Sequence, residues 1–151
     1  MSDYLLSVDP GTRDMGWALW DKGRLVDCGM ARGRDWVSTV GNMPPFPVER
    51  VVIEDQQIYR NSKIDAHALL AVARVVGAVV FYYGNEGRRR VTLVAPREWK
   101  GQLPKEVCNK RTVGKLEAME RVVLNSKKYP KSLQHNLLDA IGIGLWALGR
   151  R

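Results

Sequence analysis

The sequence predicts an α/β fold in which helices flank a mixed five-stranded sheet. Three strand-like segments come first with no helix between them, and the tight turn Asp21-Lys22-Gly23 joins two of them into a hairpin. Strand-like and helix-like segments follow in alternation. Consecutive strands favour an antiparallel meander, and strands separated by a helix favour parallel pairing. We therefore expect a meander extended by parallel strands.

The first half of the chain supplies four of these strands. The apolar run YLLSVD at 4–9 ends in a turn, and WALWD at 17–21 and GRLVDCGMA at 23–31 follow as the hairpin. Residues 32–49 contain PPFP and cannot form a long regular helix, because proline breaks helices. RVVIED at 50–55 is a β-branched apolar run, typical of a strand buried on both faces.

The second half supplies one strand and the helices. The segment 65–84 is apolar nearly all round and long enough for a helix that a glycine closes. RRRVTLVAP at 88–96 is a strand that a proline ends, and 97–112 is expected to form a short helix and a mobile basic loop. TVGKLEAMERVVL at 112–124 and the terminal segment from 135 onward complete a pair of helices.

Length and composition indicate an ordinary soluble protein. The 151 residues are expected to form one domain, 1–151, with 45% hydrophobic and 26% charged residues. No uninterrupted apolar run has the length of a membrane span, and the start of the chain lacks a long signal-peptide segment. Cys28 and Cys108 form no CxxC pair, which argues against a disulfide framework or a zinc site. We expect a cytoplasmic protein with no membrane partner.

The charge of the chain points to a polyanionic partner. The net charge is +8, and ten Lys and Arg residues lie between positions 97 and 131, against four acids. Such a surface attracts phosphate backbones and releases counterions when they bind. The alternative is a basic surface that only keeps the protein soluble. We expect this partner to be nucleic acid.

Three acids follow or interrupt apolar segments, and within the apolar last helix a carboxylate is costly to desolvate. Asp9 ends the first strand, Glu54 ends the fourth, and Asp139 lies among the apolar positions of the last helix. Neighbouring strand ends can bring the first two together, and a helix across that edge adds the third. Their repulsion raises their pKa values unless a cation such as Mg²⁺ is bound. Two such ions about 3.5–4 Å apart can activate a water and stabilise the leaving oxygen of a phosphodiester.

Each acid also has an ordinary interpretation that spacing alone leaves open. Asp9 precedes Pro10 and Gly11 and can open a turn by accepting a hydrogen bond from its own backbone. Glu54 can begin a solvated loop. Asp139 can cap a helix or pair with an arginine.

Three longer motifs carry a family resemblance. LLSVDPGTRDMGWAL, VVIEDQQIYRNSKIDAHALLAVARVVGAVV and HNLLDAIGIGLWAL occur in this order over most of the chain. They resemble the RuvC family of Holliday-junction resolving endonucleases, in the ribonuclease H-like superfamily. APREWKGQLPK resembles the compact resolvases encoded by bacteriophages. The Asp-Pro-Gly start alone is shared with actin-like ATPases, so the glutamate strand and DAIGIG carry the resemblance.

The resemblance implies a ribonuclease H-like fold with Asp9, Glu54 and Asp139 as metal ligands. The family places a fourth ligand, Asp or His, three residues before the last aspartate, where this chain has Asn136. His135 comes one position earlier, and both positions lie within about 60° of the last aspartate around a helix. Imidazole is the better ligand or general base, so we expect His135, with Asn136 as the fallback. A solvent-facing histidine at a helix start is the alternative.

DNA contacts are expected from the basic segment and from one aromatic residue. Tyr59 lies near the position where the family inserts an aromatic side chain into the opened junction, and stacking there is worth about 1–3 kcal/mol. A half-buried loop tyrosine is the alternative. The expected phosphate contacts are Lys100, Lys105, Lys110 and Arg111.

The implied function is a structure-selective, Mg²⁺-dependent DNA endonuclease that resolves four-way junctions with paired symmetric nicks. The expectations are two ions per site with Mn²⁺ able to substitute, a homodimer, and the host cytoplasm if a phage encodes the chain. No nucleotide cofactor is expected, because the chain is too short for the two domains of an actin-like ATPase. The alternatives are a less selective nuclease for branched DNA, flaps or RNA–DNA hybrids, and a non-catalytic junction-binding module.

Overall fold

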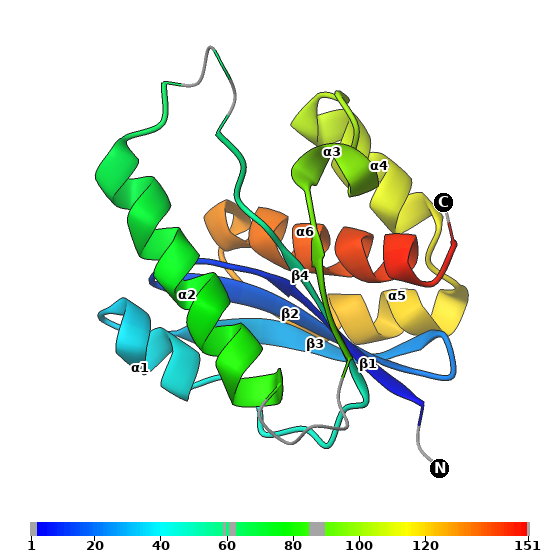
Figure 1. Ribbon diagram of the computed structural model, residues 1–151. Helices are drawn as coiled ribbons and strands as arrows, with labels where there is room; N and C mark the ends of the chain where they lie inside the picture. Colours follow the sequence, from blue (N-terminus) through cyan, green and yellow to red (C-terminus); the bar gives the residue numbers. More distant parts are fainter. Residues whose placement is uncertain (1–2, 59, 61–62, 85–89, 151) are drawn as a thin grey trace.

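A five-stranded sheet in the order β3-β2-β1-β4-β5 forms the centre of the molecule (Figure 1). The computed structural model describes residues 3–58, 60, 63–84 and 90–150. The strands are β1 (Tyr4–Asp9), β2 (Asp14–Asp21), β3 (Arg24–Arg32), β4 (Arg50–Glu54) and β5 (Arg90–Val94). Strand β2 pairs antiparallel with β1 and β3, whereas β1, β4 and β5 pair in parallel. The predicted mixed α/β sheet is therefore confirmed.

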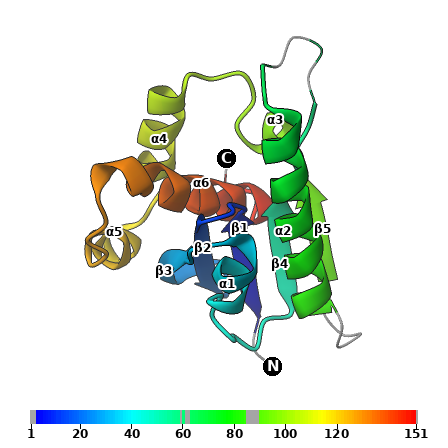
Figure 2. The ribbon, with the colours of Figure 1, turned by 90° about the vertical axis from the view of Figure 1, so that its left-hand side faces the viewer.

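Helices cover both faces of this sheet. They are α1 (Trp36–Gly41), α2 (Ala66–Gly84), α3 (Pro96–Trp99), α4 (Lys105–Gly114), α5 (Ala118–Asn125) and α6 (Lys131–Ala147). Side chains of α1 and α2 join the apolar cluster on one face, and side chains of α5 and α6 join the cluster on the other. Figure 2 shows α2 and α5 on opposite sides of the sheet.

The predicted hairpin turn connects β2 to β3. Asp21 pairs with Arg24, so Lys22 and Gly23 alone form the loop. Both have positive φ angles, 49° and 80°. Two consecutive positive φ angles are typical of a type I′ turn, whose twist matches that of the flanking strands.

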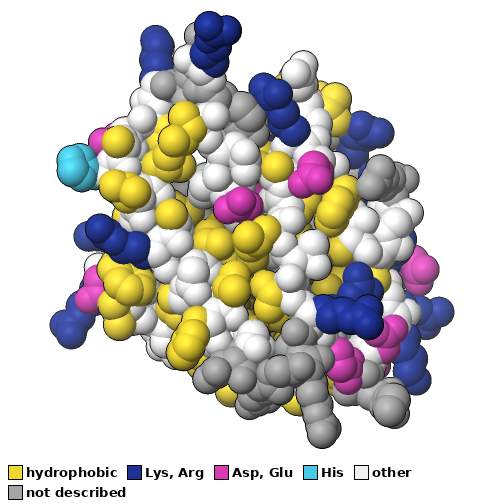
Figure 3. All heavy atoms as spheres, viewed as in Figure 1, with side chains coloured by type: hydrophobic (Ala, Val, Ile, Leu, Met, Phe, Trp, Pro, Cys, Tyr) yellow, Lys and Arg dark blue, Asp and Glu magenta, His cyan; other side chains and the backbone are white. Residues whose placement is uncertain are grey.

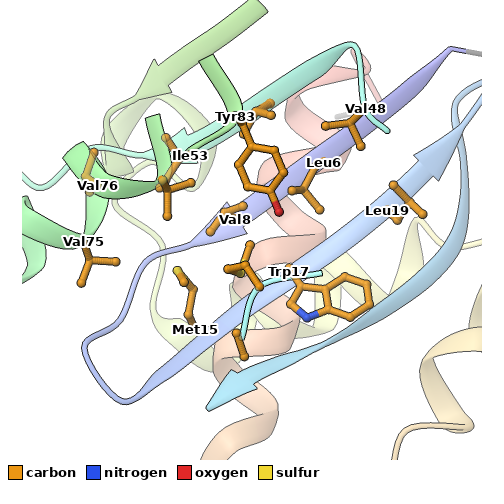
Figure 4. Packing of buried hydrophobic residues seen from close by; sticks show 14 residues of the cluster. Leu6, Val8, Met15, Trp17, Leu19, Val48, Ile53, Val75, Val76 and Tyr83 are labelled. Carbon is orange, nitrogen blue, oxygen red and sulfur yellow. The ribbon is translucent and has the colours of Figure 1, made fainter. Parts of the chain in front are cut away.

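The central strands are buried on both faces, and their alternation decides where each side chain lies. Leu6 and Val8 of β1 pack with Val75 and Val79 of α2 in one cluster (Figure 4). Leu5, two positions before Ser7, packs in the cluster that contains α6. Side chains of a strand alternate between faces, so the odd-numbered positions of β1 lie toward α6.

Two glycines allow α6 to approach the sheet closely. A Cβ atom at Gly16 of β2 would overlap the backbone oxygen of Asn136, and one at Gly144 would overlap the indole of Trp20. A larger residue at either position would separate helix and strand. The final helix is therefore seated directly on β2.

Several predicted boundaries are wrong, for local reasons. Residues 105–114 form α4 instead of a mobile basic loop, because Pro104 starts the helix and Cys108 and Thr112 give it a buried side. The next helix begins at Ala118, not at 112. Strand β2 begins at Asp14, before the expected start. The short α1 fits in the segment 32–49, ahead of the prolines.

Helix α2 is a surface helix with one buried side. Val75, Val76, Val79 and Tyr83 are its buried residues. By length and composition it could cross a membrane, which is weak evidence because helices of soluble proteins pass the same test. Its buried side packs on the sheet, whereas Leu70, Phe81 and Tyr82 are exposed.

Candidate active site

Strand pairing places Asp9 and Glu54 at the same edge of the sheet. Val8 of β1 pairs with Ile53 of β4 in parallel register, and the two acids are the next residues. Glu54 follows Val52 by two positions, and Val52 packs in the α6 cluster. Both carboxylates therefore lie on the face that α6 covers.

Helix α6 brings Asp139 to this edge. The Ser7 hydroxyl donates a hydrogen bond of 2.7 Å to the Ala140 carbonyl, and the Trp20 indole N–H donates one of 3.0 Å to Ser7. Ser7 precedes Asp9 by two residues and lies on the same face. The helix turn that carries Asp139 is thus attached to the strand that carries Asp9.

The three carboxylates interact electrostatically. Burial raises the pKa of Asp9 well above its ordinary value, and the charges of Asp139 and Glu54 raise it further. Burial also raises the pKa of Glu54, with an additional contribution from Asp139. The pKa of Asp139 is raised by burial as well. The predicted convergence of three acids is present, and their charge is only partly compensated.

Two lysines provide that partial compensation. Lys100 Nζ lies 3.9 Å from Glu54 Oε2, and its charge lowers the pKa of Asp9, Glu54 and Asp139. Lys105, at the start of α4, lowers the pKa of Asp9 and Asp139. Sequence analysis assigned both lysines to DNA phosphates alone. Their position at the acids depends on how α3 and α4 fold back over the sheet edge.

Trp99 is a site residue that sequence analysis missed. Its indole N–H donates a hydrogen bond of 2.6 Å to Glu54 Oε2. The amide of Gln56 donates a longer one, 3.3 Å, to Glu54 Oε1. Tryptophan usually supplies buried apolar area, and the sequence contains no signal that distinguishes this one from the other four.

Both candidates for the fourth position lie on α6. His135 is half-buried on α6, and its charge lowers the pKa of Asp139. Asn136 lies with its backbone oxygen against Gly16 of β2. The choice of His135 over Asn136 stays a prediction.

The donor set suits a hard cation, although the side chains do not form a ready-made coordination shell. No group of three His, Cys, Asp or Glu residues within 3–58, 60, 63–84 and 90–150 has the arrangement of a metal site. Mg²⁺ commonly takes one or two carboxylates and keeps several waters, so it requires no such shell. Buried carboxylates that repel one another are the oxygen donors that a divalent ion would stabilise.

A basic cavity of about 320 Å³ lies beside the acids. The three acids are not among the residues that line it, but Trp99 and Lys100, which both lie against Glu54, form part of its wall. Arg111 of α4 also lines it, whereas Lys110 is an exposed residue of the same helix. Tyr59 lies outside the described residues. The remaining cations of the cavity wall are Arg97, Lys115 and Arg150.

Solved structures show the same fold as this chain. The RuvC protein of Thermus thermophilus, in complex with a Holliday junction substrate, matches with a TM-score of 0.68 at 22% identity, over 97% of this chain and 94% of that one. The fowlpox virus Holliday junction resolvase matches with a TM-score of 0.65 at 13% identity, over 97% of both chains. The yeast mitochondrial Holliday junction resolvase matches with a TM-score of 0.66 at 11% identity, over 97% of this chain and 78% of that one.

No protein-family model matches the chain, and no curated protein matches it by sequence. The identities to the solved structures are low, so these likenesses establish the fold. The expected ribonuclease H-like, resolvase-type fold is confirmed.

Proposed function

We propose that this chain, which has the fold of the Holliday junction resolvases, is itself a structure-selective DNA endonuclease that resolves four-way junctions. The observation that carries the proposal is the group of three carboxylates at one sheet edge, with Glu54 buried, Asp9 and Asp139 half-buried, and Lys100 and Lys105 beside them. Purely structural acids are normally paired one to one with a cation. A cluster with excess negative charge and a basic border is suited to bind divalent ions and a phosphodiester together.

Asp9, Glu54 and Asp139 would hold two Mg²⁺ ions, with His135 as the fourth side chain and Mn²⁺ able to substitute. Ions held there would activate a water and stabilise the oxygen that leaves the phosphodiester. The carboxylates lie where strand pairing and the attachment of α6 hold them in place. Because the carboxylates are fixed, they would hold the reacting groups in place, which lowers the entropic cost of the reaction.

The basic residues bind the DNA strand that is cut. Lys100 and Lys105 bring positive charge to the acids and hold the scissile phosphate against them. Arg111 extends this charge along the cavity next to Trp99, and Lys110 lies exposed on the same helix. Contacts of this kind position a DNA backbone without reading its sequence.

We also propose that the protein acts as a homodimer through α2 and β5. Leu70, Phe81 and Tyr82 of α2 and Leu93 of β5 are large apolar side chains that are exposed in the single chain. Hydrophobic side chains gather on the face that these elements present in Figure 3. Contiguous apolar surface of this kind marks an interface. A two-fold dimer would present two sites for two symmetric cuts.

The test is cleavage of an immobile four-way junction, compared with a linear duplex of the same sequence, in Mg²⁺ and in EDTA. We expect paired nicks across the junction that require the metal and that Asp139→Asn abolishes. Equal cutting of flaps, forks or RNA–DNA hybrids would favour the less selective nuclease. Tight junction binding without cutting in Mg²⁺ or Mn²⁺ would favour the binding module and contradict the proposal.

A further inference from the structure

We propose that Trp99 is a positioning residue that fixes the Glu54 carboxylate and so sets how strongly the acid cluster binds a divalent cation. The inference rests on the proposed function, in which Glu54 is a metal ligand. It assigns a role to an indole N–H that touches no substrate and acts only through the carboxylate it binds.

The hydrogen bond between the two residues is short and well placed. Trp99 Nε1 lies 2.6 Å from Glu54 Oε2, and an indole nitrogen can only donate. Glu54 is 6% exposed, so little water competes for that oxygen. A charged acceptor in such surroundings forms one of the stronger classes of hydrogen bond. One oxygen of the carboxylate is therefore held by the indole.

The indole is itself held against the helix that carries Asp139. A Cβ atom at Gly142 would lie 2.7 Å from Cζ3 of Trp99, so the ring rests on α6 where this residue lacks a side chain. Gly142 follows Asp139 by three residues, less than one helical turn. Lys100 lies over the same ring, with Nζ 5.1 Å from its centroid. Trp99 thus connects Glu54 on β4 with the helix of a second acid and with a lysine of the site.

This connection leaves the second oxygen of Glu54 as the one for a cation. Oε1 accepts only the longer bond of 3.3 Å from Gln56 among the described contacts. Groups that hold a metal ligand through a hydrogen bond typically change metal affinity or activity by roughly 10–100-fold when they are removed. Loss of the indole N–H should act on the metal, and the fold should be little affected.

Two variants remove this contact in different ways. Trp99→Phe deletes the N–H and keeps an aromatic ring. Gly142→Ala places a methyl group against the ring and displaces it, although alanine favours a helix by about 1 kcal/mol over glycine. The matched control is Trp36→Phe, which makes the same chemical change in the cluster on the opposite face of the sheet.

The first measurement is Mn²⁺ affinity by titration calorimetry on the folded, DNA-free protein. We expect Trp99→Phe and Gly142→Ala to weaken it at least about tenfold, with the Trp36→Phe value unchanged. Unchanged Mn²⁺ affinity in both site variants would overturn the proposal.

The second measurement needs no metal and separates this inference from the proposed function. In a ¹H–¹⁵N spectrum, the indole signal absent from Trp99→Phe identifies Trp99. We expect this proton to exchange slowly with water in the parent, and faster in Glu54→Gln, whose side chain is the weaker acceptor. Fast exchange in the parent would overturn the positioning role. Slow exchange in a parent that binds no Mn²⁺ would uphold the Trp99–Glu54 link and refute the metal-dependent function.

Discussion

Ser7 and Ala140 join the first strand of the sheet to the last helix through one buried hydrogen bond of 2.7 Å. Ser7 is fully buried, and its hydroxyl also accepts the indole N–H of Trp20. Asp9 follows Ser7 on the same face of β1, and Asp139 adjoins Ala140. The contact between two ordinary residues therefore sets the separation of two candidate metal ligands.

Ser7→Ala should destabilise the protein by about 1–3 kcal/mol, because the Trp20 indole N–H loses its buried acceptor. Junction cleavage should fall as well, since α6 is no longer tied to β1. Urea unfolding and cleavage rates measure the two effects. Ser126→Ala is the control, because the Ser126 hydroxyl bonds a carbonyl only three residues away in an exposed position. Equal stability of the two variants would contradict this account.

Asp9→Asn should stabilise the metal-free protein while abolishing cleavage. Folding raises the pKa of Asp9, so Asp9 contributes to folding stability at low pH, where it is protonated. This contribution is lost as the pH rises through the pKa of the folded state. At neutral pH each pKa unit of that rise lowers the free energy of unfolding by about 1.4 kcal/mol.

Thermal melts in EDTA test this, with a melting temperature that should rise by about 3 °C for each kcal/mol recovered. Mg²⁺ should stabilise the parent more than the variant. Asp21→Asn serves as the control, since Asp21 of β2 pairs with Tyr4, at the end of β1 opposite to Asp9. A melting temperature for Asp9→Asn below that of the parent in EDTA would argue against charge repulsion in the cluster.

The Glu120–Arg150 pair should make the fold sensitive to acid. Burial alone would raise the pKa of Glu120, but two hydrogen bonds from Arg150 and backbone N–H groups of Leu25 and Glu117 lower it from 4.5 to about 2. Because folding lowers this pKa, ionised Glu120 stabilises the fold at pH values above its pKa in the unfolded chain. That stabilisation is lost as the pH falls from about 4.5 toward 2.

Glu120→Gln should therefore be less stable than the parent by about 3 kcal/mol at pH 7. Its stability should also fall less than that of the parent as the pH is lowered over that interval. Denaturant unfolding at a series of pH values measures both. The control is Arg32→Ala, which breaks an exposed pair with Asp14 and should cost less than about 1 kcal/mol. A parallel pH profile for parent and Glu120→Gln would refute the assignment.

Phe81→Glu should prevent dimer formation without unfolding the monomer, because Phe81 is 70% exposed on the outer side of α2. Sedimentation or light scattering gives the mass, and we expect a dimer for the parent. Met119→Glu is the matched control, since Met119 is 75% exposed on α5, which covers the other face of the sheet. A monomeric parent at working concentration, or a dimeric Phe81→Glu, would count against this interface.

Much of the architecture could be predicted from local patterns. The apolar run ending at Asp9, the β-branched run ending at Glu54 and the two-residue turn at Lys22-Gly23 each follow from preferences of adjacent residues. The convergence of Asp9 and Glu54 follows in turn from parallel pairing of neighbouring strands. Charge misled the prediction in one place, where the basic residues after Lys105 form a helix and not a loop.

The sequence by itself determined the order of strands and helices and the three acids, because strand and helix periodicity are properties of neighbours along the chain. Only the tertiary structure decided what surrounds those acids. Lys100 and Trp99 reach Glu54 across 45 or more positions of sequence, and Gly142 matters only because that indole rests on it. The outward apolar side of α2 likewise depends on which of its faces packs on the sheet. Such contacts depend on how elements pack in space, and no local pattern encodes the partner that each side chain meets.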